Sequence, residues 1–233
     1  MKILAVDSSG LVASVAIVEN ENLLAEYTVN YKKTHSQTLM PMLDEIVKMT
    51  DLSLDSIDAI AVAGGPGSFT GLRIGSATVK GLGLALNKPI VNVPTIDGLA
   101  YNMWGSAGRI CPIMDARRNQ VYTGVYHFVN GNLVIETQQM AIEITGLIEA
   151  LNQKEEKVTF LGDGVPVYED IIKKNIEVPY AFAPAHLNKQ RASAIGALAC
   201  VYYKEGRIET AAEHEPEYLR LSQAERERLE NLK

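Results

Sequence analysis

The sequence has few of the features that mark membrane or secreted proteins. None of its apolar runs reaches the roughly 20 residues that a membrane-spanning helix requires. The first segment, MKILAVDSS, meets an aspartate after only a few apolar residues, which is typical of a strand and not of a signal peptide. We therefore expect a cytoplasmic protein that makes no contact with a membrane.

Cysteine is also scarce, and acidic residues outnumber basic ones. The chain has two cysteines, Cys111 and Cys200, each in apolar surroundings, which indicates buried free thiols. No pair of cysteines or histidines has the spacing of a metal site. The formal net charge is −6, whereas a chain that binds nucleic acid by itself usually carries a basic surface. We expect any contact with nucleic acid to require a partner.

What the sequence does contain is the same order of elements twice. The spacing of apolar residues alternates in some segments and follows the helical period in others. It predicts three strands, a helix, a strand, a helix, a strand and a helix in each half. At Thr34, a capping box with Gln37 is expected to start the first helix, and Asn130-Gly131 forms a hairpin turn. In the first half the elements are expected at 3–7, 13–19, 23–29, 34–49, 58–63, 72–86, 88–94 and 95–104. In the second half they are expected at 109–115, 121–129, 132–139, 145–152, 157–164, 168–175, 178–184 and 191–206.

A duplicated βββαβαβα unit predicts an α/β protein of two ribonuclease-H-like lobes in tandem. This is the actin-like ATPase fold of the acetate kinase, hexokinase and actin class. We expect an N-terminal lobe at 1–106 and a smaller C-terminal lobe at 107–233, with a closing helix at 190–206 and a charged tail at 207–233. Whether the closing helix packs back on the first lobe is left open. The fold directs attention to the cleft between the lobes.

The loop GGPGSFTGLRIG, residues 64–75, is the most distinctive stretch of the chain. No lysine lies between Gly64 and Lys80, which excludes a Walker phosphate loop. The glycine spacing does not match a dinucleotide fingerprint, and Ser68 lacks the flanking glycines of a nucleophile elbow. Two interpretations remain open. The backbone N–H groups of Ser68, Phe69 and Thr70 could hold an anion, or the loop is a tight turn from strand to helix.

Small residues cover nearly every face of the helix that follows this loop. Each interior glycine costs about 0.5–1 kcal/mol relative to alanine, so close packing is expected in return. The sequence leaves open whether the packing partner is this chain or another one. The small residues are Gly71, Gly75, Ser76, Ala77, Thr78, Gly81, Gly83 and Ala85.

Five segments resemble the TsaB family, also called YeaZ, in the right order along nearly the whole chain. They are ILAVDSS, THSQTLMPMLDEIV, GGPGSFTGLRIGSATVKGLG, DARRNQVYTGVY and PEYLR. The resemblance implies a non-catalytic paralogue of TsaD, the enzyme that transfers a threonylcarbamoyl group to the adenosine beside the anticodon of bacterial tRNA. It also implies pairing with TsaD, joined by the ATPase TsaE, with tRNA contacted only through the complex and a homodimer formed through the same helices when the chain is alone.

The resemblance further implies that the first two helices, at 35–49 and 71–86, form the pairing surface. The expected partner-binding residues are His35, Leu39, Met42, Leu43, Ile46, Gly71, Arg73, Ile74, Gly75, Thr78 and Leu82. A vestigial phosphate-binding set is expected at Asp7, Ser8, Ser9, Gly65, Gly67, Ser68, Thr70, Asp115 and Arg117.

Departures from the catalytic relatives argue that the chemistry has been lost. Those relatives bind a metal through two histidines four residues apart. Here Leu39 stands four residues after His35, where the second histidine would be. Asp115 is followed by alanine and arginines where a glycine is usual. We expect no metal, no catalytic residue and no cofactor bound by the chain alone, and leave open ATP or ADP at the junction with TsaD. The alternatives are an actin-like ATPase or kinase working at Asp7 and Asp115, and a metallopeptidase.

Overall fold

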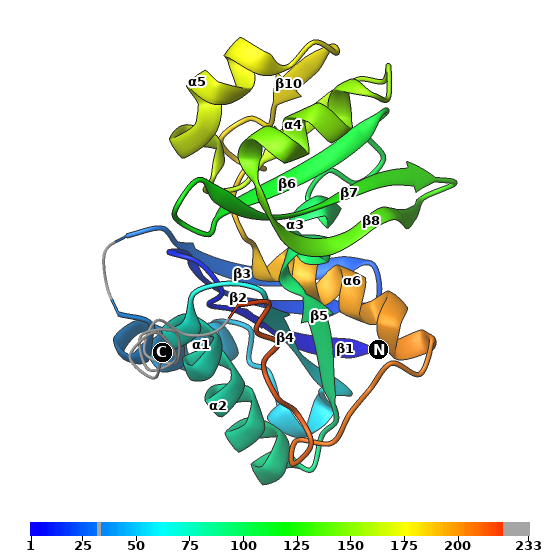
Figure 1. Ribbon diagram of the computed structural model, residues 1–233. Helices are drawn as coiled ribbons and strands as arrows, with labels where there is room; N and C mark the ends of the chain where they lie inside the picture. Colours follow the sequence, from blue (N-terminus) through cyan, green and yellow to red (C-terminus); the bar gives the residue numbers. More distant parts are fainter. Residues whose placement is uncertain (32–33, 221–233) are drawn as a thin grey trace, which may run out of the picture.

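Two mixed β-sheets of five strands each form the framework of the chain (Figure 1). The structure is a computed structural model, and it describes residues 1–31 and 34–220. Residues 221–233 of the predicted charged tail therefore lie outside the described residues. Both sheets have the same topology, because the order β3-β2-β1-β4-β5 of the first recurs as β8-β7-β6-β9-β10 in the second. The expected tandem ribonuclease-H-like fold is confirmed.

The first sheet carries helices on both faces. Alternate residues of β1 point to opposite sides, so Leu4 and Val6 pack with α1 and α2, while Ile3 and Ala5 pack with α6. Figure 1 shows α1 and α2 side by side on the outer face. The elements of this half are β1 (Lys2–Asp7), β2 (Ala13–Glu19), β3 (Asn22–Val29), α1 (His35–Met49), a 3-10 turn (Leu54–Ser56), β4 (Ala59–Gly65), α2 (Phe69–Leu86), β5 (Ile90–Pro94) and α3 (Thr95–Tyr101).

The second sheet is covered in the same way. Its outer face packs with α4 and α5 through a core that includes Phe160 and Ile172, and its inner face packs with α3 through Tyr126 and Leu161. The elements of this half are β6 (Arg109–Asp115), β7 (Gln120–Val129), β8 (Asn132–Glu143), α4 (Ile144–Asn152), β9 (Val158–Leu161), α5 (Val165–Asn175), β10 (Tyr180–Phe182) and α6 (Ala192–Lys204).

The two halves exchange their last helices. Helix α3, at the end of the first half, packs on the second sheet, and α6, at the end of the second half, packs on the first sheet. Both helices lie between the sheets in Figure 1. The carboxylate of Asp97 on α3 accepts hydrogen bonds from the hydroxyls of Tyr126 (2.8 Å) and Tyr202 (2.9 Å), so a buried polar network joins the halves.

Several local predictions are confirmed and some are wrong. Asn130 and Gly131 both have positive φ angles (51° and 80°), as the hairpin turn requires, and both cysteines are buried free thiols. Thr34 begins α1, but its side chain makes no capping hydrogen bond, so the capping box is absent. Helix α3 ends at Tyr101, short of the expected Trp104. Among the described residues no helix is long and apolar enough to span a membrane.

Candidate interlobe site and docking helices

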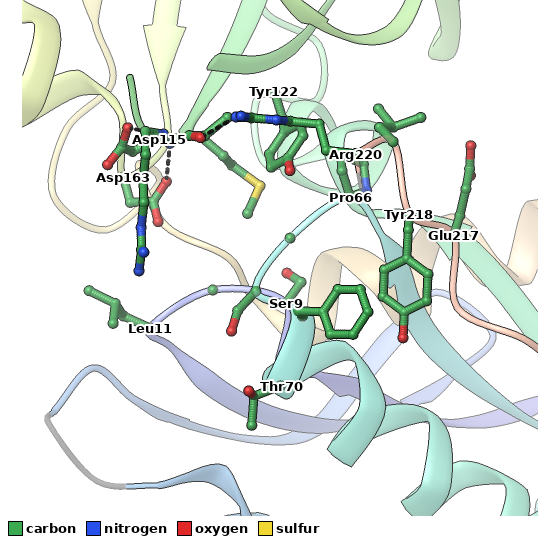
Figure 2. Close-up of a pocket in the computed structure, with 18 residues that line it drawn as sticks. Ser9, Leu11, Pro66, Thr70, Asp115, Tyr122, Asp163, Glu217, Tyr218 and Arg220 are labelled. Atoms are coloured by element: carbon green, nitrogen blue, oxygen red, sulfur yellow. Dashed lines mark hydrogen bonds between the residues drawn. The ribbon is translucent and has the colours of Figure 1, made fainter. Parts of the chain in front are cut away.

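A cavity of about 550 Å³ lies between the two lobes (Figure 2). The first lobe supplies the loop after β1 and the glycine loop with the start of α2, and the second lobe supplies the ends of β6 and β9. The C-terminal segment forms a further wall. The lining residues are Ser9, Gly10, Leu11, Pro66, Gly67, Ser68, Phe69, Thr70, Met114, Asp115, Ala116, Arg117, Tyr122, Asp163, Glu217, Tyr218, Leu219 and Arg220.

Asp7 ends β1 beneath the floor of this cavity and is only 1% exposed. Its carboxylate accepts hydrogen bonds from the backbone N–H (2.9 Å) and the hydroxyl (2.6 Å) of Ser9. Burial raises the pKa of the Asp7 carboxyl to about 6, an effect that the Ser9 bonds oppose. The carboxylate is thus engaged by its own loop and does not line the cavity.

The glycine loop fits closely around the loop that follows β1. The N–H of Ser68 donates to the carbonyl oxygen of Ser9 (2.6 Å), and the Ser68 hydroxyl caps α2 by accepting from Gly71 N–H (3.3 Å). A Cβ added to Gly67 would overlap the Ser9 carbonyl, and one added to Gly71 would overlap the carbonyl of Ser8. Of the three N–H groups considered for anion binding, that of Ser68 is occupied by Ser9.

The second lobe presents carboxylates to the cavity. The Asp115 carboxylate accepts from the N–H of Arg117 (2.8 Å) and from the hydroxyl of Tyr168 (2.8 Å). Asp163 accepts from the N–H of Asp115 (3.3 Å), and burial raises the pKa of the Asp163 carboxyl. Because two carboxylates face the cavity beside Arg117 and Arg220, its charge is mixed and does not form a simple phosphate cradle.

Six of the nine predicted vestigial phosphate residues come together at the cavity. They are Ser9, Gly67, Ser68, Thr70, Asp115 and Arg117. Asp7, Ser8 and Gly65 do not line it, since Asp7 is covered by Ser9 and the Ser8 hydroxyl donates to the carbonyl of Gly71 (2.8 Å). Sequence reasoning missed the wall formed by Glu217, Tyr218, Leu219 and Arg220, although PEYLR was one of the segments that carried the resemblance.

The predicted docking residues of α1 and α2 divide into two groups. Leu39, Leu43 and Ile46 are buried in the core of the first lobe, so the prediction that they form a partner-facing stripe is wrong. Gly71 and Gly75 are also turned inward, because a Cβ at either would overlap Ser8.

The remaining docking candidates lie at or near the surface. Arg73 is exposed, and His35, Met42, Ile74, Thr78 and Leu82 are partly exposed. The prediction omitted the exposed residues Met40, Ala77, Gly81, Leu84 and Ala85. Ala77, Gly81, Leu84 and Ala85 recur at helical spacing and form what we call the outward row of α2. This spacing is the signal in the sequence that could have identified the row.

Comparisons with known proteins agree with this geometry. Residues 22–228 match the sequence family described as "TsaD: tRNA N6-adenosine threonylcarbamoyltransferase". The chain is 34% identical over 236 residues to the tRNA threonylcarbamoyladenosine biosynthesis protein TsaB of Bacillus subtilis (strain 168), and the match covers 100% of both chains. The chain belongs to the TsaB family. It is 29% identical to the Escherichia coli (strain K12) TsaB, over 94% of this chain and 95% of that protein.

A solved structure named "YeaZ from Pseudomonas aeruginosa" shares the fold of this TsaB family member. Its TM-score is 0.79 at 26% sequence identity, and the match covers 94% of this chain and 99% of that one. Both names, TsaB and YeaZ, are those expected from the five sequence segments.

The single histidine of α1 has a local structural contact in this TsaB family member. His35 Nε2 donates to the carbonyl oxygen of Gly10 (2.8 Å), in the loop that ends at β2. The residue four positions later, Leu39, is 1% exposed and belongs to the core. In the part of the chain that the structure describes, no three His, Cys, Asp or Glu side chains gather as a metal-ligand set.

Proposed function

We propose that the chain is the non-catalytic subunit of the bacterial complex that installs threonylcarbamoyladenosine beside the tRNA anticodon, and that it pairs with and activates TsaD. TsaE is the third protein of this proposed complex. The chain contacts tRNA only as part of the complex. Any ATP or ADP binds at the junction with TsaD. In the absence of TsaD the same helices pair two copies of the chain. Membership of the TsaB family, whose relatives are named as tRNA threonylcarbamoyladenosine biosynthesis proteins, supports the pathway.

The outward row of α2 carries the proposal for pairing. Gly81 lies in this row and is exposed, and among the described residues nothing beyond its own stretch of the helix comes within 4 Å of the place where a Cβ would stand. An exposed glycine inside a helix costs about 0.5–1 kcal/mol relative to alanine, and no contact within the described part of the chain offsets that cost. Close approach of a partner backbone does offset it. Neighbouring Leu84 is 65% exposed, which adds an apolar contact beside the glycine.

Helix α1 extends this surface. Met40 and Met49 are 51% and 68% exposed on the helix that packs beside α2, and because nine positions separate them they lie on opposite sides of it, so one of the two adjoins the row on α2. Two helices from each partner would form a four-helix bundle. A stable interface of this kind buries roughly 1,200–2,000 Å² of surface in total.

The interlobe site supports a non-catalytic role. The Asp7 carboxylate is buried and bonded to Ser9, and the Ser9 carbonyl accepts the Ser68 N–H that an anion would need. The Asp7 carboxylate and the Ser68 N–H, two of the first-lobe groups that an ATPase of this fold class would use, are therefore both engaged by Ser9. A steady ATP turnover by the isolated chain, lost on replacing Asp7, would instead favour the ATPase alternative.

Leu84→Asp is expected to weaken binding to TsaD by at least about tenfold, because it places a charge in an apolar interface. The matched control is Val167→Asp, which changes an apolar side chain that is 55% exposed on α5 of the other lobe. Calorimetric titration with TsaD measures both affinities, and thermal unfolding shows that both variants fold. Equal affinity of Leu84→Asp and wild type would exclude this face of α2.

Reconstitution tests the role in the complex. TsaD and TsaE together are expected to modify tRNA only when the chain is added, and Leu84→Asp is expected to require a higher concentration for the same rate. Threonylcarbamoyl-adenylate carrying labelled threonine is supplied as the donor, and the measurement is transfer of the label to tRNA. Full activity of TsaD and TsaE without the chain would overturn the proposal.

A further inference from the structure

The C-terminal segment at residues 209–220, here named the strap, is anchored first on the N-terminal lobe. Ile90 of β5 and Glu209 exchange two backbone hydrogen bonds (2.9 and 3.0 Å), which adds a short antiparallel pairing at the sheet edge. Lys80 of α2 donates from Nζ to the carbonyl oxygens of Ala212 (3.1 Å) and His214 (2.7 Å). The strap therefore follows α2 toward the cavity.

The far end of the strap crosses the cavity to the second lobe (Figure 2). The N–H of Glu217 donates to Gly64 O (2.7 Å), and the Tyr218 ring stacks on Phe69 with the centroids 4.2 Å apart. The Arg220 guanidinium then donates to the carbonyl oxygen of Ala116, in the loop after β6. On the second lobe, Gln139 of β8 also donates to the Glu217 carboxylate (2.9 Å).

The covalent crossings between the lobes lie elsewhere. The chain passes from the first half to the second between α3 and β6, and it returns between β10 and α6, the helix that packs on the first sheet. The Asn102 side chain donates to the carbonyl oxygens of Leu187 (3.1 Å) and Lys189 (2.7 Å), so the two crossings are bonded to each other. None of these three residues lines the cavity. Paired crossings of this kind are where two lobes hinge.

We infer that the strap is a latch that holds the two lobes closed over the interlobe cavity. Its fastening points are the stack of Tyr218 on Phe69 and the hydrogen bond from Arg220 to Ala116. The paired crossings act as the hinge, and the strap is a further non-covalent tie between the lobes, at the cavity. Release of the strap frees both edges of the cavity. The inference depends only on the contacts within this chain and not on the proposed pairing with TsaD.

Hydrogen–deuterium exchange of the full chain tests the latch. Two amides report on the two edges of the cavity: Ser68 N–H, bonded to Ser9, and Ala116 N–H, bonded to the carbonyl of Gln120 (2.9 Å). Tyr218→Ala is expected to accelerate exchange at both edges by about threefold to tenfold, because it removes one stacked aromatic pair. Tyr218→Phe keeps the ring and is expected to exchange at the wild-type rate.

Two further variants make the result decisive. Arg220→Ala removes the hydrogen bond to Ala116. It is expected to accelerate hydrogen exchange of the Ala116 and Glu217 amides together. Tyr31→Ala, which truncates a tyrosine that is 72% exposed, controls for loss of a surface ring and is expected to change neither edge. Faster exchange in the strap of Tyr218→Ala with wild-type exchange at Ala116 would overturn the latch, since the strap would then belong to the first lobe alone. Wild-type exchange throughout would overturn it as well.

Discussion

Asp7→Asn is expected to stabilise the chain at neutral pH by up to about 3 kcal/mol. Burial raises the pKa of the Asp7 carboxyl from its ordinary value of 3.8 to about 6, so at neutral pH the folded chain keeps an ionised carboxylate away from water. The asparagine carbonyl can accept the same hydrogen bonds from Ser9 without carrying a charge. Chemical denaturation at pH 7.5 measures the gain in the free energy of unfolding.

The pH dependence of this gain follows from the direction of the pKa shift. Between about pH 3.8 and pH 6 the folded wild-type chain binds the Asp7 proton more tightly than the unfolded chain does. The contribution of Asp7 to stability is therefore greatest below pH 3.8 and falls as the pH rises through 6. The advantage of Asp7→Asn should be complete above pH 6 and should vanish below pH 3.8.

Asp170→Asn on α5 is the control, because this exposed aspartate lies in the other lobe. Its effect on stability is expected to stay within about 0.5 kcal/mol at both pH values. A loss of stability in Asp7→Asn at pH 7.5 would contradict the prediction. Loss of tRNA modification in a stabilised Asp7→Asn complex would show that the carboxylate has a chemical role.

Gly75→Leu is expected to destabilise the chain by about 3 kcal/mol, because it overfills a closed part of the core. Gly75 is buried, its added side chain would overlap the Ser8 hydroxyl, and Val62 Cγ2 stands 3.7 Å from the added Cβ. Gly81→Leu on the same helix is the matched control, since Gly81 has open space around it. Leucine is the better helix former there, so a gain of about 0.5–1 kcal/mol is expected.

Thermal unfolding of the two variants, measured at one protein concentration at which the chain is monomeric, separates these outcomes. A Gly75→Leu chain as stable as wild type would mean that α2 does not pack on Ser8 as described. A strongly destabilised Gly81→Leu chain would mean that this face of α2 is not open in the free chain. The sequence-based prediction that Gly75 faces a partner is wrong, because Gly75 points into the core and Gly81 points outward. Leucine at these two positions is therefore expected to have opposite effects on stability.

Much of the fold was predictable because its signals are local. The apolar run before Asp7 and the alternation in the following strands predict β1, β2 and β3. Asn130-Gly131 specifies the hairpin by its own backbone preference. The sequence leaves the glycine loop open between anion binding and a tight turn, and the Ser8 and Ser9 carbonyls that it approaches are identified only in the folded chain.

The sequence by itself therefore determined the repeated element order, the family and a third of the residues at the cavity. Only the tertiary structure decided that α3 and α6 exchange sheets, which side of α2 faces outward, and that the strap joins Phe69 to Ala116. The physical reason is the range of the contacts. Small residues lie on nearly every face of α2, so its sequence has no single apolar face that would identify the buried side. The strap is held by residues far away in the sequence, and no local pattern predicts that they lie close together.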